Sequence, residues 1–392
     1  MTRSLALWLI VGGLGVAAYA YLGYPLLLKL VSVLRPRPPR VQEPAEWPLV
    51  SITVPAYNEE HSIAATLEAL LAIDYPADRR QVLVVSDAST DRTDEIVRGF
   101  AHRGVELLCL PVRGGKTAAE NAAQPHLRGE IVVNTDASVR IAPNALKPLV
   151  ACFADPEVGL ASGRDVSVAQ IDGDLNVGES GYVGYEMWVR DLETRVGSIV
   201  GASGCFYALR KPLHVTLFPS ALSRDFAAAL IARESGYRAV SVSEAVCFVP
   251  RIQSLRREYR RKVRTMIRGL ETLWYKRRLL DPWRHGRFAW MLASHKLIRW
   301  LAPWGLVLAA LGWLLLAASI RSVLLAAPLA ALLLLAGAGW YWPEQRRAPR
   351  LVSMSAYVVS GTIAALEAWL RALRGELNPM WEPTRRSAAA PR

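Results

Sequence analysis

The long uncharged segments of this 392-residue chain constrain its fold most, because they lie toward its two ends and leave a polar middle. Residues 5–34 contain a single charge, Lys29, and residues 301–320 and 322–342 contain none. About 20 consecutive apolar residues form a helix that can cross the ~30 Å hydrocarbon layer of a membrane. We therefore expect an N-terminal membrane anchor and a C-terminal hairpin of two membrane helices that turns at Arg321.

A third C-terminal segment, residues 351–370, is less apolar, since it carries Ser353, Ser355, Thr362 and Glu367. Its hydropathy favours a further crossing of the membrane. Two alternatives stay open, because such a segment also suits the membrane interface or a packed position against the other helices.

Basic residues indicate the orientation of the chain. Arg35, Arg37 and Arg40 follow the first apolar segment and a dense set of Arg and Lys residues between 251 and 299 precedes the hairpin, whereas only Arg3 stands at the start. Such residues concentrate on the cytosolic side. We expect an integral protein of a bacterial inner (plasma) membrane with its middle region in the cytosol. A third C-terminal crossing conflicts with this rule, because it would carry four arginines outside: Arg371, Arg374, Arg385 and Arg386.

The middle region alternates short β-branched runs with amphipathic stretches, which is typical of parallel strands joined by helices. The expected strands are residues 49–54, 81–86, 105–110 and 130–134, and helices are expected at 59–73 and 91–102. Right-handed crossovers then give an open, doubly wound α/β sheet, in which ligands bind beyond the carboxyl ends of the strands.

Polar loops follow three of these strands and would meet at one edge of the sheet. They are residues 55–60, 87–91 and 136–138, and each contains at least one acid. Residues 113–116, Arg-Gly-Gly-Lys, lie between them, and these glycines and cations suit a diphosphate. The spacing matches neither the ATPase phosphate loop nor the Gly-x-Gly-x-x-Gly motif of dinucleotide enzymes, so both classes are disfavoured. The four cysteines form no C-x-x-C pair, which argues against a zinc site.

Seven short motifs follow one another along the chain. They are Gly23-Tyr-Pro25; Pro55-Ala-Tyr57-Asn58-Glu59; Ser86-Asp87-Ala-Ser-Thr-Asp91; Gly115-Lys116 with Asn121; Thr135-Asp136-Ala-Ser138; Gly201-Ala-Ser-Gly204 before Tyr207-Ala-Leu-Arg210; and Asp225 with Arg233 and Gly236-Tyr-Arg238. Together they resemble the family 2 glycosyltransferases, inverting enzymes of the GT-A fold, particularly membrane-integrated members near the bacterial hyaluronan, poly-N-acetylglucosamine and cellulose synthases. The resemblance covers nearly the whole chain. It implies a nucleotide-sugar-binding, Rossmann-like domain inserted between transmembrane helices.

The resemblance also implies roles for individual residues. Asp225 would be the catalytic base that takes the proton from the acceptor hydroxyl. The donor would contact Pro55, Tyr57, Asn58, Glu59, Asp87, Lys116, Asp136 and Arg264, and the acceptor would contact Gly204, Tyr207 and Arg224. Asp136 would also touch a divalent metal, Mn²⁺ or Mg²⁺, on the donor diphosphate. Ser138 replaces the second acid of the family's Asp-x-Asp pair, so dependence on the metal is left open.

The implied function is transfer of a sugar, with inversion, from a nucleotide-diphosphate sugar to a membrane-associated glycan or lipid-linked acceptor in cell-surface or extracellular polysaccharide synthesis. A UDP-sugar is the expected donor. The Gln-x-x-Arg-Trp motif of processive synthases falls on residues 261–265, where Arg264 is kept and the Gln and Trp are not. Single transfer is therefore favoured over processive polysaccharide synthesis. A polyprenyl-phosphate glycosyltransferase is the other alternative.

Residues 254–274 combine apolar side chains at helical spacing with seven arginines and lysines. Such a basic amphipathic helix lies at the surface of an anionic membrane. The expected organisation is an anchor at 1–40, a cytosolic catalytic domain at 41–250, interface helices at 251–299, the membrane hairpin at 300–342, a third membrane or interface helix at 343–372 and a polar tail at 373–392.

The candidate site residues also have purely structural interpretations. Asp87 and Asp91 suit helix caps, Asp136 suits a turn, and Asp225 suits the acidic start of a helix. No nucleic-acid partner is expected in spite of the net charge of +13, because the acidic crevice opposes one. A membrane-tethered binding subunit is the alternative outside the transferases.

Overall fold

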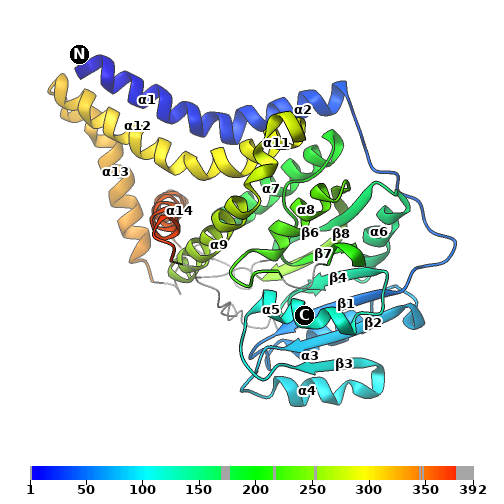
Figure 1. Ribbon diagram of the computed structural model, residues 1–392. Helices are drawn as coiled ribbons and strands as arrows, with labels where there is room; N and C mark the ends of the chain where they lie inside the picture. Colours follow the sequence, from blue (N-terminus) through cyan, green and yellow to red (C-terminus); the bar gives the residue numbers. More distant parts are fainter. Residues whose placement is uncertain are drawn as a thin grey trace.

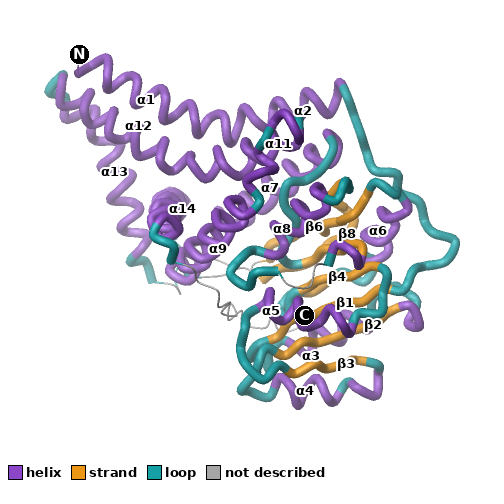
Figure 2. Tube along the Cα trace, in the orientation of Figure 1, coloured by secondary structure: helices purple, strands orange, loops and turns teal. Residues whose placement is uncertain are grey.

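The computed structural model describes residues 2–168, 177–214, 218–250, 254–343, 346 and 348–376. They form an α/β region, built on one eight-stranded sheet, and a group of long apolar helices beside it (Figure 1). All strands belong to the α/β region (Figure 2). Most of the predicted tail, from residue 377 onward and including Arg385 and Arg386, lies outside the described residues.

The sheet has the strand order β3-β2-β1-β4-β7-β6-β8-β5. The strands are β1 (Val50–Ala56), β2 (Arg80–Ser86), β3 (Val105–Cys109), β4 (Ile131–Thr135), β5 (Arg140–Ile141), β6 (Val158–Val168), β7 (Phe206–Arg210) and β8 (Arg238–Pro250). The first four are parallel, as predicted, since β1 pairs with β2 and β4, and β2 with β3. Because β7 is antiparallel to both β4 and β6, the sheet is mixed, and the expected doubly wound arrangement holds only for its N-terminal half.

Helices cover both faces of the sheet. On one face, α3 (Ile63–Leu71), α4 (Thr93–Gly99) and α6 (Leu146–Ala151) close an apolar core that includes Ile52 and Val84. On the other face, α5 (Lys116–Ala123) and α8 (Arg224–Glu234) cover a core that includes Leu83 and Val132. Successive strand residues point to opposite faces, so one β-branched run fills both cores.

Four helices among the described residues are long and apolar enough to cross a membrane: Thr2–Leu34, Arg287–Ser319, Val323–Trp340 and Arg350–Leu373. The first comprises α1 (Thr2–Ala18), the π-helical turn η1 (Tyr19–Gly23) and α2 (Tyr24–Leu34). The second comprises α11 (Arg287–Leu292), the π-helical turn η8 (Ala293–Ile298) and α12 (Arg299–Ser319). The other two are α13 (Val323–Trp340) and α14 (Arg350–Leu373). The predicted anchor and hairpin segments are therefore helical.

The remaining helices are α7 (Val177–Val196), α9 (Leu255–Tyr275) and the short α10 (Pro282–His285). Short 3-10 turns connect other elements at η2 (Ala77–Arg79), η3 (Ala101–Arg103), η4 (Gln124–His126), η5 (Cys152–Ala154), η6 (Lys211–Leu213) and η7 (Arg277–Leu280).

A buried group of charged side chains joins the apolar helices to the α/β region. Glu193 on α7 accepts a hydrogen bond from Tyr24 Oη at 2.5 Å and lies 2.6 Å from His295 Nδ1. The other ring nitrogen of His295 lies 2.9 Å from Glu186, which also pairs with Arg299 at 2.5 Å. His295 therefore bridges the two carboxylates of α7 through its two ring nitrogens. One network thereby fixes α2, α7 and the start of α12 to one another.

α9 lies between α14 and the α/β region. Val263 and Ile267 of α9 pack against Ala364 and Ala368 of α14. From the α/β side, the backbone N–H of Ser223 donates to Thr272 Oγ1 at 2.9 Å. The expectation that the apolar face of this segment lies in the membrane interface is therefore wrong for Val263 and Ile267, because α14 covers them.

α1 and α12 run antiparallel and approach closely through glycines. A side chain on Gly13 would overlap the carbonyl oxygen of Gly305 and lie 2.9 Å from the backbone nitrogen of Ala309. A side chain on Gly312 would lie 2.7 Å from the carbonyl oxygen of Ala6. Small residues of this kind let the backbones of membrane helices pack tightly.

Gly13→Leu should force α1 away from α12 and destabilise the protein by about 1–3 kcal/mol, because backbone atoms cannot move aside as a side chain can. The measurement is the Tm of the purified protein in detergent. Gly15→Leu is the matched control, since no atom lies within 4 Å of a Cβ at that position. Equal Tm values for the two variants would contradict this packing.

Candidate active site

Asp87 follows β2 and holds the glycine loop that precedes α5. Its two carboxylate oxygens accept hydrogen bonds from the backbone N–H groups of Gly114 and Gly115, each at 2.7 Å. Gly115 has a φ of +85°, a conformation that favours glycine. Beside this loop, the guanidinium of Arg113 stacks on the Tyr57 ring at 3.8 Å. Asp87 is therefore not a helix cap, and it fixes the loop in which we predicted a donor contact.

The loop after β1 is bound to the loop after β2. The backbone N–H of Thr90 donates to Asn58 Oδ1 at 2.8 Å, and the backbone N–H of Glu59 donates to Thr93 Oγ1 at 2.8 Å. Asp91 accepts from the backbone N–H of Thr93 at 2.9 Å, at the start of α4. The cap interpretation therefore fits Asp91, while Asn58 and Glu59, with Pro55 at the end of β1, build the wall beside Asp87.

Lys116 connects three of the predicted site segments. Its Nζ donates to Asp136 Oδ1 at 2.5 Å and to the carbonyl oxygen of Gly204 at 2.8 Å. Burial by itself lowers the pKa of this ammonium, but the carboxylates of Asp136, Glu120 and Asp225 outweigh burial and raise the pKa above its usual value. A permanent cation therefore lies where the end of β4, the start of α5 and the 201–204 loop meet.

Asp136 is the one predicted metal ligand at this point. Within the part of the chain that the structure describes, no group of three or more His, Cys, Asp or Glu residues could hold a metal ion. Asp136 gives one oxygen to Lys116, and Oδ2 has no hydrogen-bond partner among the described residues. This fits a metal such as Mg²⁺, which commonly takes one or two protein carboxylates and completes its shell with substrate phosphates and water.

Asp225 lies in the first turn of α8, half-buried, and faces the 201–204 loop. Its Oδ1 accepts a hydrogen bond from Ser223 Oγ at 2.6 Å. A Cβ on Gly204 would lie 2.8 Å from Asp225 Oδ2, so only glycine leaves the space around this carboxylate open. The structure therefore brings the predicted base and the predicted acceptor contact Gly204 together, next to Lys116.

Two predicted acceptor contacts lie elsewhere. Tyr207 is 1% exposed, because its position on β7 points it into the core beneath α5 and α8, so the prediction that it contacts an acceptor is wrong. The Arg224 side chain is 7% exposed and lies 3.5 Å from Glu120 and 3.2 Å from His214 Nδ1. Arg224 thus connects α8 to α5 and to the end of η6 inside the protein. Because its side chain is buried, the structure does not favour the predicted contact with an acceptor.

Two charged residues that were not predicted from the sequence, Glu120 and Arg268, lie next to this site. Glu120 is fully buried and has no hydrogen-bond partner among the described residues, and burial raises the pKa of its carboxyl. Arg268 on α9 donates to Thr117 Oγ1 at 3.0 Å and to the carbonyl oxygen of Leu222 at 2.5 Å. Arg268 lies one turn beyond the predicted donor contact Arg264, which is half-buried on the same helix. The helical spacing of four was the signal that could have linked the two arginines.

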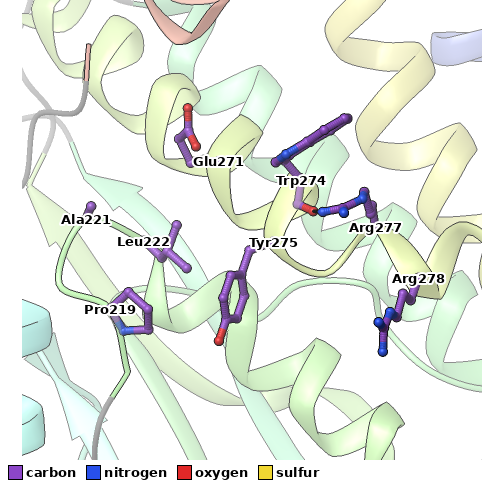
Figure 3. A pocket seen from close by; sticks show the side chains of 8 residues that line it. All are labelled: Pro219, Ala221, Leu222, Glu271, Trp274, Tyr275, Arg277 and Arg278. Atoms are coloured by element: carbon purple, nitrogen blue, oxygen red, sulfur yellow. Dashed lines mark hydrogen bonds between the residues drawn. The ribbon is translucent and has the colours of Figure 1, made fainter. Parts of the chain in front are cut away.

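A groove of about 450 Å³ opens between the loop that leads to Asp225 and the end of α9 (Figure 3). Its walls are Pro219, Ala221, Leu222, Glu271, Trp274, Tyr275, Arg277 and Arg278. The Arg277 guanidinium lies 4.7 Å from the centre of the Trp274 ring. Exposed aromatic and cationic side chains therefore line a concave surface next to α8.

His214 generates a prediction about acid stability. Burial, with a smaller contribution from Arg224, lowers the pKa of His214 to about 3. The folded protein therefore favours the neutral ring. The contribution of the neutral ring to the free energy of unfolding is complete above the unfolded pKa near 6.5 and is lost as the pH falls toward 3. At pH 5 the loss relative to pH 7 should be about 2 kcal/mol.

The Tm measured between pH 7 and pH 5 should fall less in His214→Asn than in the unmodified protein. His102→Asn, a change at an exposed histidine, should keep the full acid sensitivity. If both variants lose the same Tm on acidification as the unmodified protein, the neutral buried state of His214 is refuted.

Comparison with known proteins agrees with this geometry. Residues 51–211 match the family described as Glycosyl transferase family 2. A solved mannosyltransferase from Pyrobaculum calidifontis, in complex with GDP-Man and Mn²⁺, superimposes with a TM-score of 0.70 and 27% identity over 93% of this chain and 99% of that one.

Curated relatives match over part of their length. A β-monoglucosyldiacylglycerol synthase from Nostoc sp. is 30% identical over 173 residues, 43% of this chain and 37% of the relative. An N-acetylglucosaminyltransferase from Rhizobium meliloti is 29% identical over 253 residues, 57% of this chain and 58% of the relative. The chain thus spans less than two thirds of these relatives. Residues 51–211 are thus similar to glycosyl transferase family 2, and the shared architecture shows the GT-A fold.

Proposed function

We propose that this protein transfers one sugar, with inversion, from a nucleotide-diphosphate sugar to a hydroxyl group of a lipid or lipid-linked glycan at the cytosolic face of a membrane. The observation that carries this proposal is the position of Asp225. The next residue, Phe226, packs edge-on against Trp300 at the start of α12, with ring centroids 5.9 Å apart. Phe226 also shares an apolar cluster with Tyr24 and Leu28 of the anchor. The predicted base thus lies where the catalytic region meets the apolar helices.

Asp225 supplies the base for this reaction. Its carboxylate removes the proton from the acceptor hydroxyl while that oxygen attacks the anomeric carbon from the face opposite the leaving diphosphate, which inverts the anomeric centre. Ser223 Oγ donates to one carboxylate oxygen at 2.6 Å and orients it, and Gly204 leaves room at the other. A positioned base of this kind contributes about 10²–10⁴-fold to the rate.

Lys116 supports departure of the diphosphate. Its ammonium already lies against Asp136 and Gly204, so the developing negative charge on the leaving group meets a fixed cation. Asp87 holds the adjacent glycine loop and so fixes where α5 begins. Asp136 would hold a divalent metal whose role is to neutralise charge on the diphosphate.

The comparisons support the donor and acceptor classes. The Pyrobaculum mannosyltransferase binds GDP-Man and Mn²⁺, so GDP-Man joins a UDP-sugar among the proposed donors. The monoglucosyldiacylglycerol synthases carry a diacylglycerol lipid in their name, which favours a lipid acceptor for this chain over a growing polysaccharide. The changed residues in the processive motif support the same choice.

The test is nucleotide release by the protein in nanodiscs that contain bacterial lipid extract, with a panel of UDP- and GDP-sugars and with Mn²⁺, Mg²⁺ or EDTA. One donor should release nucleotide and label one lipid product. Asp225→Asn should lower kcat by about 10²–10⁴-fold with little change in the donor Kd, because the amide keeps its shape but cannot accept a proton.

Glu95→Gln, at an exposed pair with Arg92 on α4, is the control and should keep full activity. A long polymeric product would mean that the protein is a processive synthase and does not transfer a single sugar. If no donor is turned over under any condition, the function becomes that of a membrane-tethered binding subunit.

A further inference from the structure

We propose that α14 lies along the cytosolic face of the membrane instead of crossing it, so that the chain crosses three times and its C-terminal end stays on the side of the catalytic region. The partner of its outer face is the headgroup layer of the lipid bilayer. This inference rests on the membrane location proposed above. It decides between the three placements that the sequence left open for residues 351–370.

The hairpin of α12 and α13 fixes the level of the cytosolic surface. α12 runs from Arg299 to Ser319 and α13 returns from Val323 to Trp340, and each is long enough for one crossing. Figure 1 shows the two helices meeting near the N-terminal end of α1 and diverging from there. If both cross, Trp300 and Trp340 lie on the same side. Tryptophan is enriched at membrane–water interfaces, which suits both positions.

α14 touches both of these cytosolic ends. Near its start, a Cβ on Gly339 of α13 would lie 3.0 Å from the carbonyl oxygen of Val352. Near its end, Trp369 Nε1 donates to the carbonyl oxygen of Trp300 at 2.8 Å. A helix that crosses the bilayer separates its two ends by about 30 Å along the membrane normal. α14 cannot do this while its first and last turns contact residues at the same level.

α9 packs against α14 near both of its ends. Leu255 shares an apolar cluster with Ala356 near the start of α14, and Ile267 shares one with Ala368 near its end. α9 is itself bound to the catalytic region, since Arg268 donates to the carbonyl oxygen of Leu222 at 2.5 Å. α14 is therefore attached, through α9, to the part of the protein that holds the proposed active site.

The outer side of α14 suits a membrane surface. Its exposed apolar residues are Leu351, Met354, Val358, Ile363, Leu370 and Leu373. Ser353, Ser360 and Thr362 donate to carbonyl oxygens of the helix itself. At the C-terminal end Arg371 pairs with Glu367 at 2.6 Å and Arg374 is exposed. An apolar face with cations at its edge is typical of a helix that lies in the interface of an anionic membrane. This placement also keeps Arg371 and Arg374 on the cytosolic side, which removes the conflict with the positive-inside rule.

The first test places reporters on the full chain. Two reporters are fused after Arg392 in separate strains. Alkaline phosphatase is active only outside the cytosol. Green fluorescent protein does not fluoresce when it is exported unfolded, so its fluorescence marks the cytosolic side. We expect fluorescence and no phosphatase activity. Phosphatase inserted in the 320–322 turn is the matched control and should be active. Phosphatase activity at the C-terminus would overturn the proposal.

The second test introduces one lysine in two lipid-facing helices. Ile363 in the middle of α14 and Leu311 in the middle of α12 are similarly exposed, at 51% and 49%. Ile363→Lys should leave the amount of protein in carbonate-washed membranes within about two-fold, since a lysine in the interface reaches water. Leu311→Lys should lower it about ten-fold or more, because that position lies at the bilayer centre.

An equal large loss in both variants would mean that α14 crosses the membrane. Release of the unmodified protein by the carbonate wash would instead refute the membrane location on which the proposed function rests. The two failures are therefore distinguishable.

Discussion

The buried charge network around Glu193 and His295 is the interaction on which the rest of the structure depends. Removing charges from water is costly unless each finds partners, and here carboxylates on α7 meet Tyr24 of the anchor and His295 and Arg299 of the second apolar helix. The same Glu193 carboxylate accepts from the backbone N–H of Val200 at 3.3 Å. Val200 directly precedes the loop that carries Gly204. The contacts that fix the membrane helices therefore also fix one wall of the site.

Next to that wall, the loops that follow several strands meet at one edge of the sheet and form the candidate active site. The parallel strands β1, β2 and β4 end at one edge, so the Asp87 and Asp136 loops approach each other, and Lys116 joins them to the loop after α7. α8 then brings Asp225 against Gly204. The same helix packs on Trp300 through Phe226, so the proposed base lies beside the apolar helices. This position is the reason for proposing an acceptor held in lipid.

Much of this could be predicted from the sequence, because local patterns determine it. β-Branched runs predicted the four parallel strands, and uncharged runs predicted the helices of the anchor and the hairpin. The positions of Lys116 and Asp136 near the ends of particular strands predicted that they lie close together, whereas Asp225 was placed with them only by the family resemblance. The errors have one physical cause. Periodicity tells which side of an element is apolar, but the neighbour that covers it is set by tertiary packing. The apolar face of α9 therefore looked like a membrane face although α14 covers it, and Tyr207 looked like a ligand contact although β7 points it into the core. Glu120 carried no signal at all, since an acid in a short helix is normally exposed.

The anomeric configuration of the product tests the central claim most directly. In the proposed mechanism, Asp225 activates the acceptor oxygen for a single displacement opposite the diphosphate. NMR of the purified lipid product should then show the anomeric configuration opposite to that of the nucleotide-sugar donor. Retention of the donor configuration would contradict the account, because a single displacement with Asp225 as base cannot produce it.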